Sequence, residues 1–210
     1  MNIEEALHSC GIIAILRGLT PAEALPVGEA LHAAGIRVVE VPLNSPQPFD
    51  SIARLASAFA GRMVVGAGTV LSEADVNMLR EAGGSISVSP DCNPAVIARA
   101  LALGLTPFPG VFTPTEAFAA VRAGAVHLKL FPAEAASPLT VKAWRAVLPP
   151  HVKLHAVGGV TASNMEAWRN AGISGFGIGS NLYKPGKSAA EVARDSQAFV
   201  AAEKAARRTA

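Results

Sequence analysis

A lysine lies in the middle of a short apolar segment, GAVHLKLFP, which spans residues 124–132. The segment has the composition of a buried strand, and an ammonium group buried there is costly unless it is paired or neutral. Burial lowers the pKa of a lysine, and the resulting free amine can attack a ketone and form a Schiff base. The position of Lys129 therefore predicts a covalent nucleophile. The alternative is a structural ion pair inside the protein.

A glutamate occupies a similar position in the segment VVEVP, residues 38–42. Successive side chains of a strand point to opposite faces. In both segments the aliphatic residues on one face are expected to pack on helices, which leaves Lys129 and Glu40 on the inner face. A carboxylate beside a reactive lysine can carry protons during a reaction. The pair therefore indicates acid–base chemistry at a covalent intermediate.

Two glycine-containing turns predict a phosphate site. They are GGVT, residues 158–161, and GIGS, residues 177–180. Glycine lets backbone amides approach an anion closely, and a helix N-terminus favours negative charge. Either turn alone would be weak evidence, but the two follow successive predicted strands. The residues expected to hold an anion are Gly158, Gly159, Gly179 and Ser180.

An arginine, Arg17, directly follows the apolar segment 12–16. Its guanidinium group is planar and permanently charged, and it can bind a carboxylate or a phosphate through two parallel hydrogen bonds. An ordinary surface arginine is the alternative. The sequence does not decide which of the two anions it would hold.

These residues are distributed over a regular alternation of short β-rich segments and longer helical ones. The expected strands cover residues 12–16, 38–42, 63–66, 85–88, 105–109, 126–131, 152–157 and 175–178. A helix is expected after each, with Thr20 and Pro21, Ser72, and Thr161 as helix start signals. Eight such units predict an α/β fold, a (β/α)8 TIM barrel forming a single domain over residues 1–210. A doubly wound open sheet would leave two edge strands and fits eight regular units less well.

The barrel explains why residues far apart in the sequence would meet. Active sites of TIM barrels lie at the carboxyl ends of the strands. Arg17, Glu40, Lys129 and both glycine turns lie at or near such ends. They are therefore expected around one cavity.

Composition excludes several classes of function. The net charge is +2, only 16% of the 210 residues are charged, and no basic patch with interleaved aromatics occurs, so no nucleic-acid partner is expected. No apolar stretch approaches the ~20 residues of a membrane helix. The N-terminus also lacks the basic segment and the long apolar segment of a signal peptide. Cys10 and Cys92 are expected as free thiols in a cytoplasmic protein. The histidines show no metal-ligand spacing, so neither a metal nor a cofactor is expected.

Five motifs, in combination and order, resemble the 2-keto-3-deoxy-6-phosphogluconate/2-keto-3-deoxy-6-phosphogalactonate aldolase family. They are ILRG (15–18), VEVPLNSP (39–46), GAGTV (66–70), LKLFP (128–132) and AVGGV (156–160). The resemblance covers nearly the whole chain. It implies a class I aldolase, an aldehyde-lyase of carbohydrate metabolism with the (β/α)8 fold, which needs no metal. Members of the family are commonly homotrimers.

The resemblance also implies the reaction, the cleavage of a phosphorylated keto-deoxy sugar acid to pyruvate and D-glyceraldehyde 3-phosphate. Lys129 matches the Schiff-base lysine and Glu40 the acid/base glutamate. Thr69 and the amides of its loop match the part that holds the pyruvyl end. The residues that match the phosphate end are Gly158, Gly159, Gly179 and Ser180.

The motifs favour the galactonate-type members of the family. Gluconate-type members resemble EVTLRTP on the second strand, whereas this chain has EVPLNSP, residues 40–46, without the arginine. Arg17 could supply that charge, and Val157 stands where gluconate-type members carry threonine. The predicted substrate is therefore 2-dehydro-3-deoxy-6-phospho-D-galactonate of galactonate catabolism, with the gluconate epimer of an Entner–Doudoroff type pathway as the alternative. A phosphosugar isomerase or epimerase, or a non-catalytic phosphosugar-binding barrel, is more distant, because neither needs Lys129 opposite Glu40.

Overall fold

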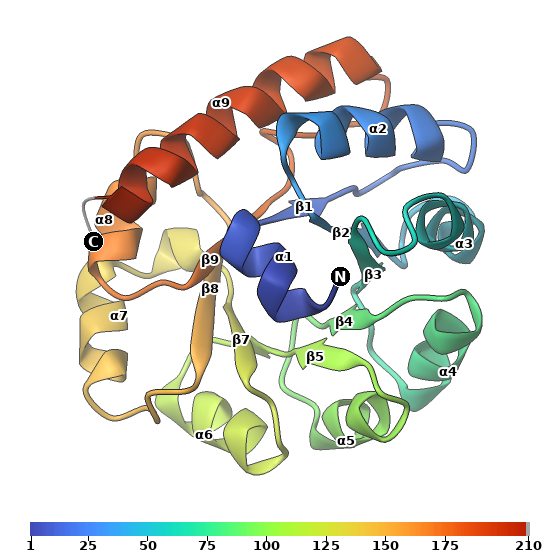
Figure 1. The fold of residues 1–210 in the computed structure, drawn as a ribbon. Coiled ribbons are helices and arrows are strands. Elements are labelled where there is room, and N and C mark those ends of the chain that lie inside the picture. Colours follow the sequence, from blue (N-terminus) through green and yellow to red (C-terminus); the bar gives the residue numbers. More distant parts are fainter. Residues whose placement is uncertain (209–210) are drawn as a thin grey trace.

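Parallel strands close into a barrel that is surrounded by helices (Figure 1). The computed structural model describes residues 1–208. Its strands are β1 (Ile12–Ile15), β2 (Val38–Pro42), β3 (Val64–Gly68), β4 (Ile86–Val88), β5 (Thr106–Phe108), β6 (Gly110–Val111), β7 (His127–Leu130), β8 (Lys153–Val157) and β9 (Gly175–Ile178). The predicted (β/α)8 architecture and all eight predicted strands are confirmed.

The fifth predicted strand is divided in two. The strand order is β5-β4-β3-β2-β1-β9-β8-β7-β6, so β5 and β6 lie at the two ends of the order. Only Pro109 separates them in the sequence, and the barrel closes at that point. Proline lacks the N–H that a continuous ladder would use. Its carbonyl oxygen nevertheless accepts a hydrogen bond of 2.9 Å from the backbone N–H of Lys129, which ties β7 to the junction.

Helices follow the strands around the outside of the barrel. They are α2 (Ala24–Ala34), α3 (Pro48–Ala58), α4 (Glu73–Glu81), α5 (Pro94–Ala102), α6 (Pro114–Arg122), η1 (Ala133–Ala135), α7 (Pro138–Arg145), α8 (Met165–Asn170) and α9 (Ala189–Arg208). One further helix, α1 (Ile3–Ser9), precedes the first strand and was not predicted. It lies across the end of the barrel where the strands begin, in front of the strands in Figure 1.

Of the three helix start signals named from the sequence, one is confirmed and two are wrong. Ser72 caps α4 by accepting the N–H of Asp75. By contrast α2 begins only at Ala24, because Thr20 Oγ1 donates to the carboxylate of Glu23 and residues 21–23 form a turn. Residues 162–164 also form a turn, so α8 begins at Met165 and Thr161 does not cap it.

The apolar side chains of the strands divide into two layers, as their alternation predicts. Val39 and Val41 of β2 and Leu128 and Leu130 of β7 belong to the outer core, which also contains the buried faces of the helices. A smaller cluster fills the lower part of the barrel interior and includes Ala6 and Leu7 of α1; its strand members are Ile13, Val38, Val64, Ile86, Val88 and Phe108. Glu40 and Lys129 are therefore on the inner faces of their strands, above this cluster.

Within residues 1–208, no helix is both long and apolar enough to cross a membrane.

Candidate active site

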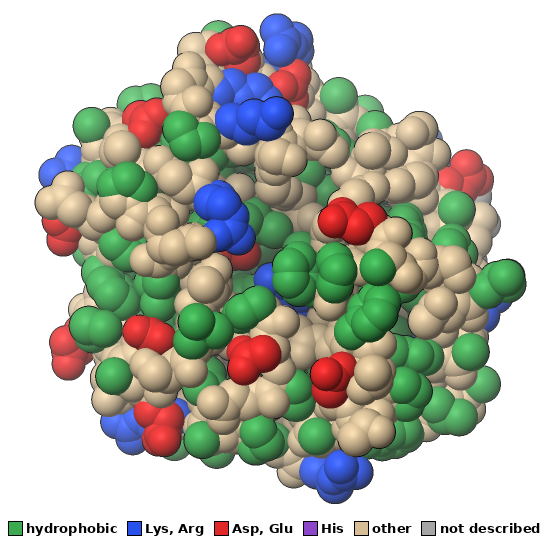
Figure 2. Space-filling view, turned by 180° about the vertical axis from the view of Figure 1, so that it is seen from behind, with side chains coloured by type: hydrophobic (Ala, Val, Ile, Leu, Met, Phe, Trp, Pro, Cys, Tyr) green, Lys and Arg blue, Asp and Glu red, His purple; other side chains and the backbone are tan. Residues whose placement is uncertain are grey.

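A cavity of about 580 Å³ opens where the strands end. Figure 2 shows this end of the barrel, hollowed at its centre, with basic and acidic side chains within and around the hollow. The predicted site residues that line it are Arg17, Glu40, Lys129, Val157, Gly158, Gly159, Gly179 and Ser180. The structure thus brings together residues from β1, β2, β7, β8 and β9 and the loops that follow them.

Lys129 lies on β7 with its side chain buried, only 7% exposed. Its ammonium group is 4.7 Å from the centre of the Phe131 ring, and it makes no hydrogen bond or ion pair with the described residues. Burial lowers the pKa of Lys129 from its ordinary value of 10.5; nearby Glu40 opposes this change and Arg17 adds to it. The result is a larger share of free amine near neutral pH.

Glu40 lies on β2 and is also buried, with 2% of its surface exposed. One carboxylate oxygen, Oε2, has no hydrogen-bond partner. A Cβ at Gly68 would lie 1.8 Å from that oxygen, so the glycine on β3 makes room for the carboxylate. Burial raises the pKa of Glu40 to about 7, even though the positive charges of Lys129 and Arg17 pull it down.

Lys129 and Glu40 do not form the structural ion pair that is the alternative interpretation of their positions. The two side chains form no ion pair with each other, although each influences the pKa of the other. A carboxyl group with a pKa near 7 exchanges protons readily in both directions at neutral pH. An amine with a lowered pKa is a better nucleophile.

The raised pKa of Glu40 predicts a dependence of stability on pH. The folded protein binds the Glu40 proton more tightly than the unfolded chain does, so stability falls as pH rises from about 4.5 to about 7. Above pH 7 the buried carboxylate costs roughly 3 kcal/mol. Glu40→Gln is therefore expected to stabilise the protein at pH 8 by up to about 3 kcal/mol and by much less at pH 5. Urea unfolding at both pH values measures this, and an equal difference at both would contradict it.

Arg17 lies at the edge of the cavity and is exposed. Its Nη1 donates a hydrogen bond of 2.7 Å to Oδ1 of Asn44, which also lines the cavity. The next residue, Gly18, donates from its backbone N–H to Oγ of Ser45 at 2.9 Å. The loops after β1 and β2 are thus joined, and they hold Arg17 beside Glu40.

The glycine turns differ in why they contain glycine. Gly158 and Gly159 have φ angles of +102° and +65°, a conformation that other residues rarely adopt. Gly179 is not in that conformation, and a Cβ there would meet only Cβ of Ile15, at 3.9 Å. Neither a close neighbour nor a positive φ requires glycine at position 179, and the missing side chain leaves open space at the cavity.

Thr69 is the one predicted site residue that does not line the cavity. It follows β3, is half-buried, and has a φ of +58°. It comes directly after Gly68, so it lies on the side of the site where the Glu40 carboxylate packs.

Several further residues that line the cavity are not predicted from the sequence. Glu134, Asn181, Tyr183 and Lys184 all line the cavity. Glu134 is exposed, but its Oε2 is only 3.0 Å from where a Cβ of Gly158 would be. The available signal was position, because each of these residues follows β7 or β9 within a few residues.

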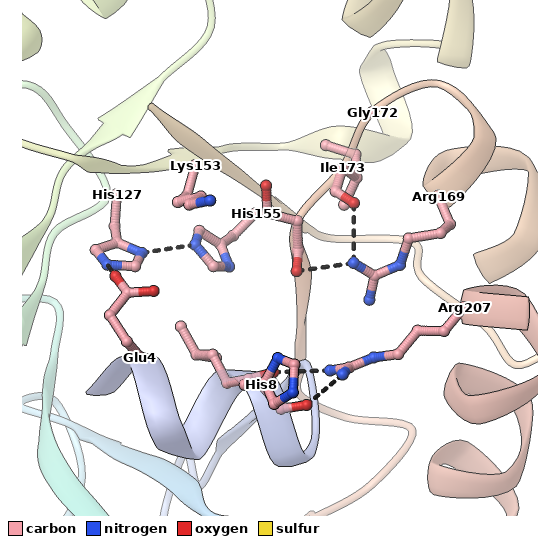
Figure 3. Close-up of a pocket in the computed structure, with 11 residues that line it drawn as sticks. Glu4, His8, His127, Lys153, His155, Arg169, Gly172, Ile173 and Arg207 are labelled. Carbon is pink, nitrogen blue, oxygen red and sulfur yellow. Dashed lines mark hydrogen bonds and ion pairs between the residues drawn. The ribbon is translucent and has the colours of Figure 1, made fainter. Parts of the chain in front are cut away.

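A second cavity of about 390 Å³ lies at the opposite end of the barrel, beside α1 (Figure 3). His127 Nε2 is 3.0 Å from the Glu4 carboxylate, and its Nδ1 is 3.0 Å from Nε2 of His155. Burial lowers the pKa of both histidines, most strongly that of His155. The contact with Glu4 of α1 places His127 at the end of the barrel where the strands begin.

The arginines around this second cavity serve the packing of the helices. Arg207 donates to the carbonyl oxygens of Leu7 and His8 at the end of α1, and Arg169 donates to those of Ile173 and Ser174. Both arginines also pair with the fully buried Glu203 of α9. Their charges are thus engaged in holding α1, α8 and α9 together.

The chain has close relatives among curated proteins. The chain is 49% identical over 191 residues to the "Probable 2-dehydro-3-deoxy-6-phosphogalactonate aldolase" of Rhizobium meliloti (strain 1021), covering 91% of this chain and 90% of that protein. It is 46% identical over 191 residues to the "2-dehydro-3-deoxy-6-phosphogalactonate aldolase" of Escherichia coli (strain K12), covering 91% and 93%.

Solved structures agree with these relatives. A structure described as "Native KDPGal structure" superimposes with a TM-score of 0.92 at 45% identity, covering 94% of this chain and 96% of that one. A chain of a cube-shaped protein cage, designed by fusing symmetric oligomeric domains, superimposes with a TM-score of 0.93 at 45% identity, covering 94% and 73%. The sequence also matches the family described as KDPG and KHG aldolase over residues 3–195. The match spans every strand and the whole cavity, and the chain belongs to the KDPG and KHG aldolase family.

Proposed function

We propose that the protein is a class I aldolase that cleaves 2-dehydro-3-deoxy-6-phospho-D-galactonate to pyruvate and D-glyceraldehyde 3-phosphate. The observation that carries this proposal is the buried, unpaired Lys129 beside Glu40, whose pKa is raised to about 7, in one cavity. The names of the two relatives at 49% and 46% identity support the choice of substrate and its place in galactonate catabolism.

The reaction begins at Lys129. Its free amine attacks the C2 ketone of the substrate, and the adduct takes up a proton and loses one water, which leaves a protonated imine. The positive nitrogen then draws electrons from the bond between C3 and C4. Burial of Lys129 assists because it disfavours the protonated amine, which cannot attack.

Glu40 carries the proton that the cleavage releases. Its carboxylate takes the proton of the C4 hydroxyl, directly or through a water, and C4 becomes the aldehyde carbon as the C3–C4 bond breaks. The electron pair of that bond moves into the imine and gives an enamine. The enamine takes a proton at C3, and addition of water to the imine releases pyruvate and regenerates Lys129.

The other predicted residues would hold the two ends of the substrate. Thr69 and its loop are assigned to the pyruvyl end, because they follow β3 next to Glu40. Arg17 is assigned to an anionic group of the substrate. The amides and the hydroxyl of the turns after β8 and β9 are assigned to the phosphate; these belong to Gly158, Gly159, Gly179 and Ser180.

Val157 is expected to help set the preference for the C4 epimer. Its side chain is buried at the end of β8 and lines the cavity. A threonine there would add a hydroxyl that can bond a substrate hydroxyl, and such a contact discriminates between epimers. Val157→Thr is expected to shift the ratio of kcat/KM for the galactonate and gluconate substrates by about 10-fold towards gluconate. An unchanged ratio of kcat/KM in a steady-state comparison would show that Val157 does not set the preference for the epimer.

We also propose that residues 1–210 form a single catalytic domain that assembles as a homotrimer in the cytoplasm. Oligomerisation is supported by the similarity to a chain used as a symmetric oligomeric domain in a designed cage. Large apolar side chains on the surface add to this, with Leu139 on α7 75% exposed and Val147 just after α7 59% exposed. A charged, phosphorylated substrate and two free thiols suit the cytoplasm.

The direct test is pyruvate release from each epimer of the phosphorylated sugar acid. We expect pyruvate to be released faster from the galactonate epimer than from the gluconate epimer. Preference for the gluconate epimer would favour the Entner–Doudoroff alternative. Turnover of the substrate without pyruvate would point to the isomerase or epimerase alternative.

A further inference from the structure

The phosphate group of the proposed substrate carries about two negative charges, and a cationic side chain near the glycine turns would neutralise part of them. Backbone amides donate charge-assisted hydrogen bonds to a phosphate but carry no net charge, whereas a lysine or arginine adds a full positive charge. Three basic side chains line the cavity: Arg17, Lys129 and Lys184. The structure distinguishes their positions.

Arg17 and Lys129 lie at the reacting end of the cavity. Lys129 is the proposed nucleophile and must contact C2. The positive charge of Arg17 lowers the pKa of both Lys129 and Glu40, so Arg17 lies close to the groups that act on C2 and C4. The phosphate is attached to C6, at the far end of the substrate. Lys184 is the remaining basic side chain of the cavity.

The loop that carries Lys184 is held firmly after β9. Its neighbour Tyr183 is buried, with 2% of its surface exposed. On the other side, Pro185 packs against Gly18, where a Cβ would lie 2.6 Å from the proline ring. Lys187 ties the loop by donating to the carbonyl oxygen of Leu182 at 2.8 Å and pairing with Asp195. Lys184 itself is exposed and makes no hydrogen bond or ion pair with residues 1–208.

A turn with free backbone donors precedes Lys184. The carbonyl oxygen of Gly179 accepts hydrogen bonds from the N–H groups of Leu182 and Tyr183, at 2.8 and 3.0 Å. The N–H groups of Gly179, Ser180 and Asn181 donate to no acceptor within the described residues. The open space above Gly179 lets an anion approach these donors.

A carboxylate, that of Glu134, also lines the cavity. Glu134 packs over the other glycine turn, with Oε2 3.0 Å from a Cβ position at Gly158 and 3.1 Å from one at Gly159. A phosphate bound between the two glycine turns has this like charge beside it, which weakens its binding. Glu134 therefore opposes Lys184 in its effect on a bound phosphate.

We propose that Lys184 is the cation that holds the substrate phosphate above the free amides of the turn formed by Gly179, Ser180 and Asn181, with Glu134 limiting the affinity. This inference rests on the proposed function, since it names what recognises the phosphate of that substrate. It makes Lys184 the residue by which the enzyme selects phosphorylated over unphosphorylated sugar acids.

Inorganic phosphate tests the proposal without the reaction. Its dissociation constant is measured by calorimetry for the wild type, Lys184→Met, Lys184→Arg and Glu134→Gln, with exposed Lys142 on α7 changed to Met as the matched control. Lys184→Met is expected to weaken binding about 10-fold, and Lys184→Arg to retain it. Glu134→Gln is expected to strengthen binding roughly 2- to 5-fold, and Lys142→Met to leave it unchanged. Equal affinity of the wild type and Lys184→Met, or no phosphate binding by the wild type, would overturn the proposal.

Catalysis separates this inference from the proposed function. Lys184→Met is expected to lower kcat/KM about 10-fold for the phosphorylated sugar acid and not for its unphosphorylated counterpart. Imine formation with pyruvate, which lacks a phosphate, is expected to be unchanged in Lys184→Met. An equal loss with both sugar acids would overturn the role of Lys184 at the phosphate. Absence of an imine in the wild type would instead refute the aldolase proposal, and the phosphate titration would still decide the role of Lys184.

Discussion

Lys129→Ala is expected to abolish cleavage of the phosphorylated sugar acid while leaving the protein folded. Removal of a covalent nucleophile costs on the order of 10⁴- to 10⁶-fold in turnover, because no other group can form the intermediate. Lys129 is the basic side chain of the cavity that is buried and unpaired on an inner strand face. Pyruvate release, measured with a coupled assay, reports the loss, and circular dichroism reports the fold.

Two further variants make this result interpretable. Lys129→Met keeps most of the buried volume and is expected to be as inactive as alanine, which separates loss of the amine from creation of a cavity. Lys142→Ala changes an exposed lysine of α7 and is expected to retain full activity. Activity within 10-fold of the wild type in either Lys129 variant would contradict the Schiff-base mechanism.

Glu40→Gln is expected to slow turnover by about 10²- to 10⁴-fold, the usual contribution of a general acid–base group. The amide fills the same space beside Gly68 but cannot accept the C4 hydroxyl proton. Imine formation with pyruvate is expected to persist, since Lys129 is still present and uncharged amine is still available. In the wild type, activity is expected to rise with pH towards about 7 as Glu40 ionises, and this rise should be absent from the variant.

The matched control is Glu81→Gln, which changes an exposed glutamate at the end of α4 and is expected to behave as the wild type. Complete loss of imine in Glu40→Gln would show that Glu40 activates Lys129 rather than moves the substrate proton. A retained rise of activity with pH would show that another group titrates.

The fold was predictable because its signals are repeated. Each strand is a short apolar run followed by a helical segment, and eight such units permit few arrangements. Local boundaries were less predictable. Thr20 and Pro21 have the residue types of a helix start, but the Thr20 hydroxyl bonds Glu23 and the chain makes a turn before α2.

Helix α1 shows how a short element escapes detection. Its seven residues are too few for a hydrophobic period to show. Asn2 and Glu5 do form a capping box, with both hydrogen bonds at 2.9 Å. That spacing was present in the sequence and could have indicated the helix.

The site was predictable where it lies on strands and less so where it lies on loops. Lys129 and Glu40 are polar residues in apolar runs, so their burial and their common inner face follow from alternation. Lys184 and Glu134 lie in polar loops, where a charge is the ordinary case and its orientation depends on packing. The contact of Pro185 with Gly18 and the position of Glu134 over Gly158 join residues far apart in the sequence, which no local pattern reveals.

The central claim is that Lys129 forms an imine with pyruvate, and one measurement tests it most directly. The protein is incubated with pyruvate, and the imine is reduced with borohydride. The mass of the intact protein is then measured by mass spectrometry, and peptide mapping locates the modified residue. We predict that the mass rises by one reduced pyruvyl group per chain and that this group is located on Lys129. Folded protein with no gain in mass, or with the group on another lysine, would contradict it.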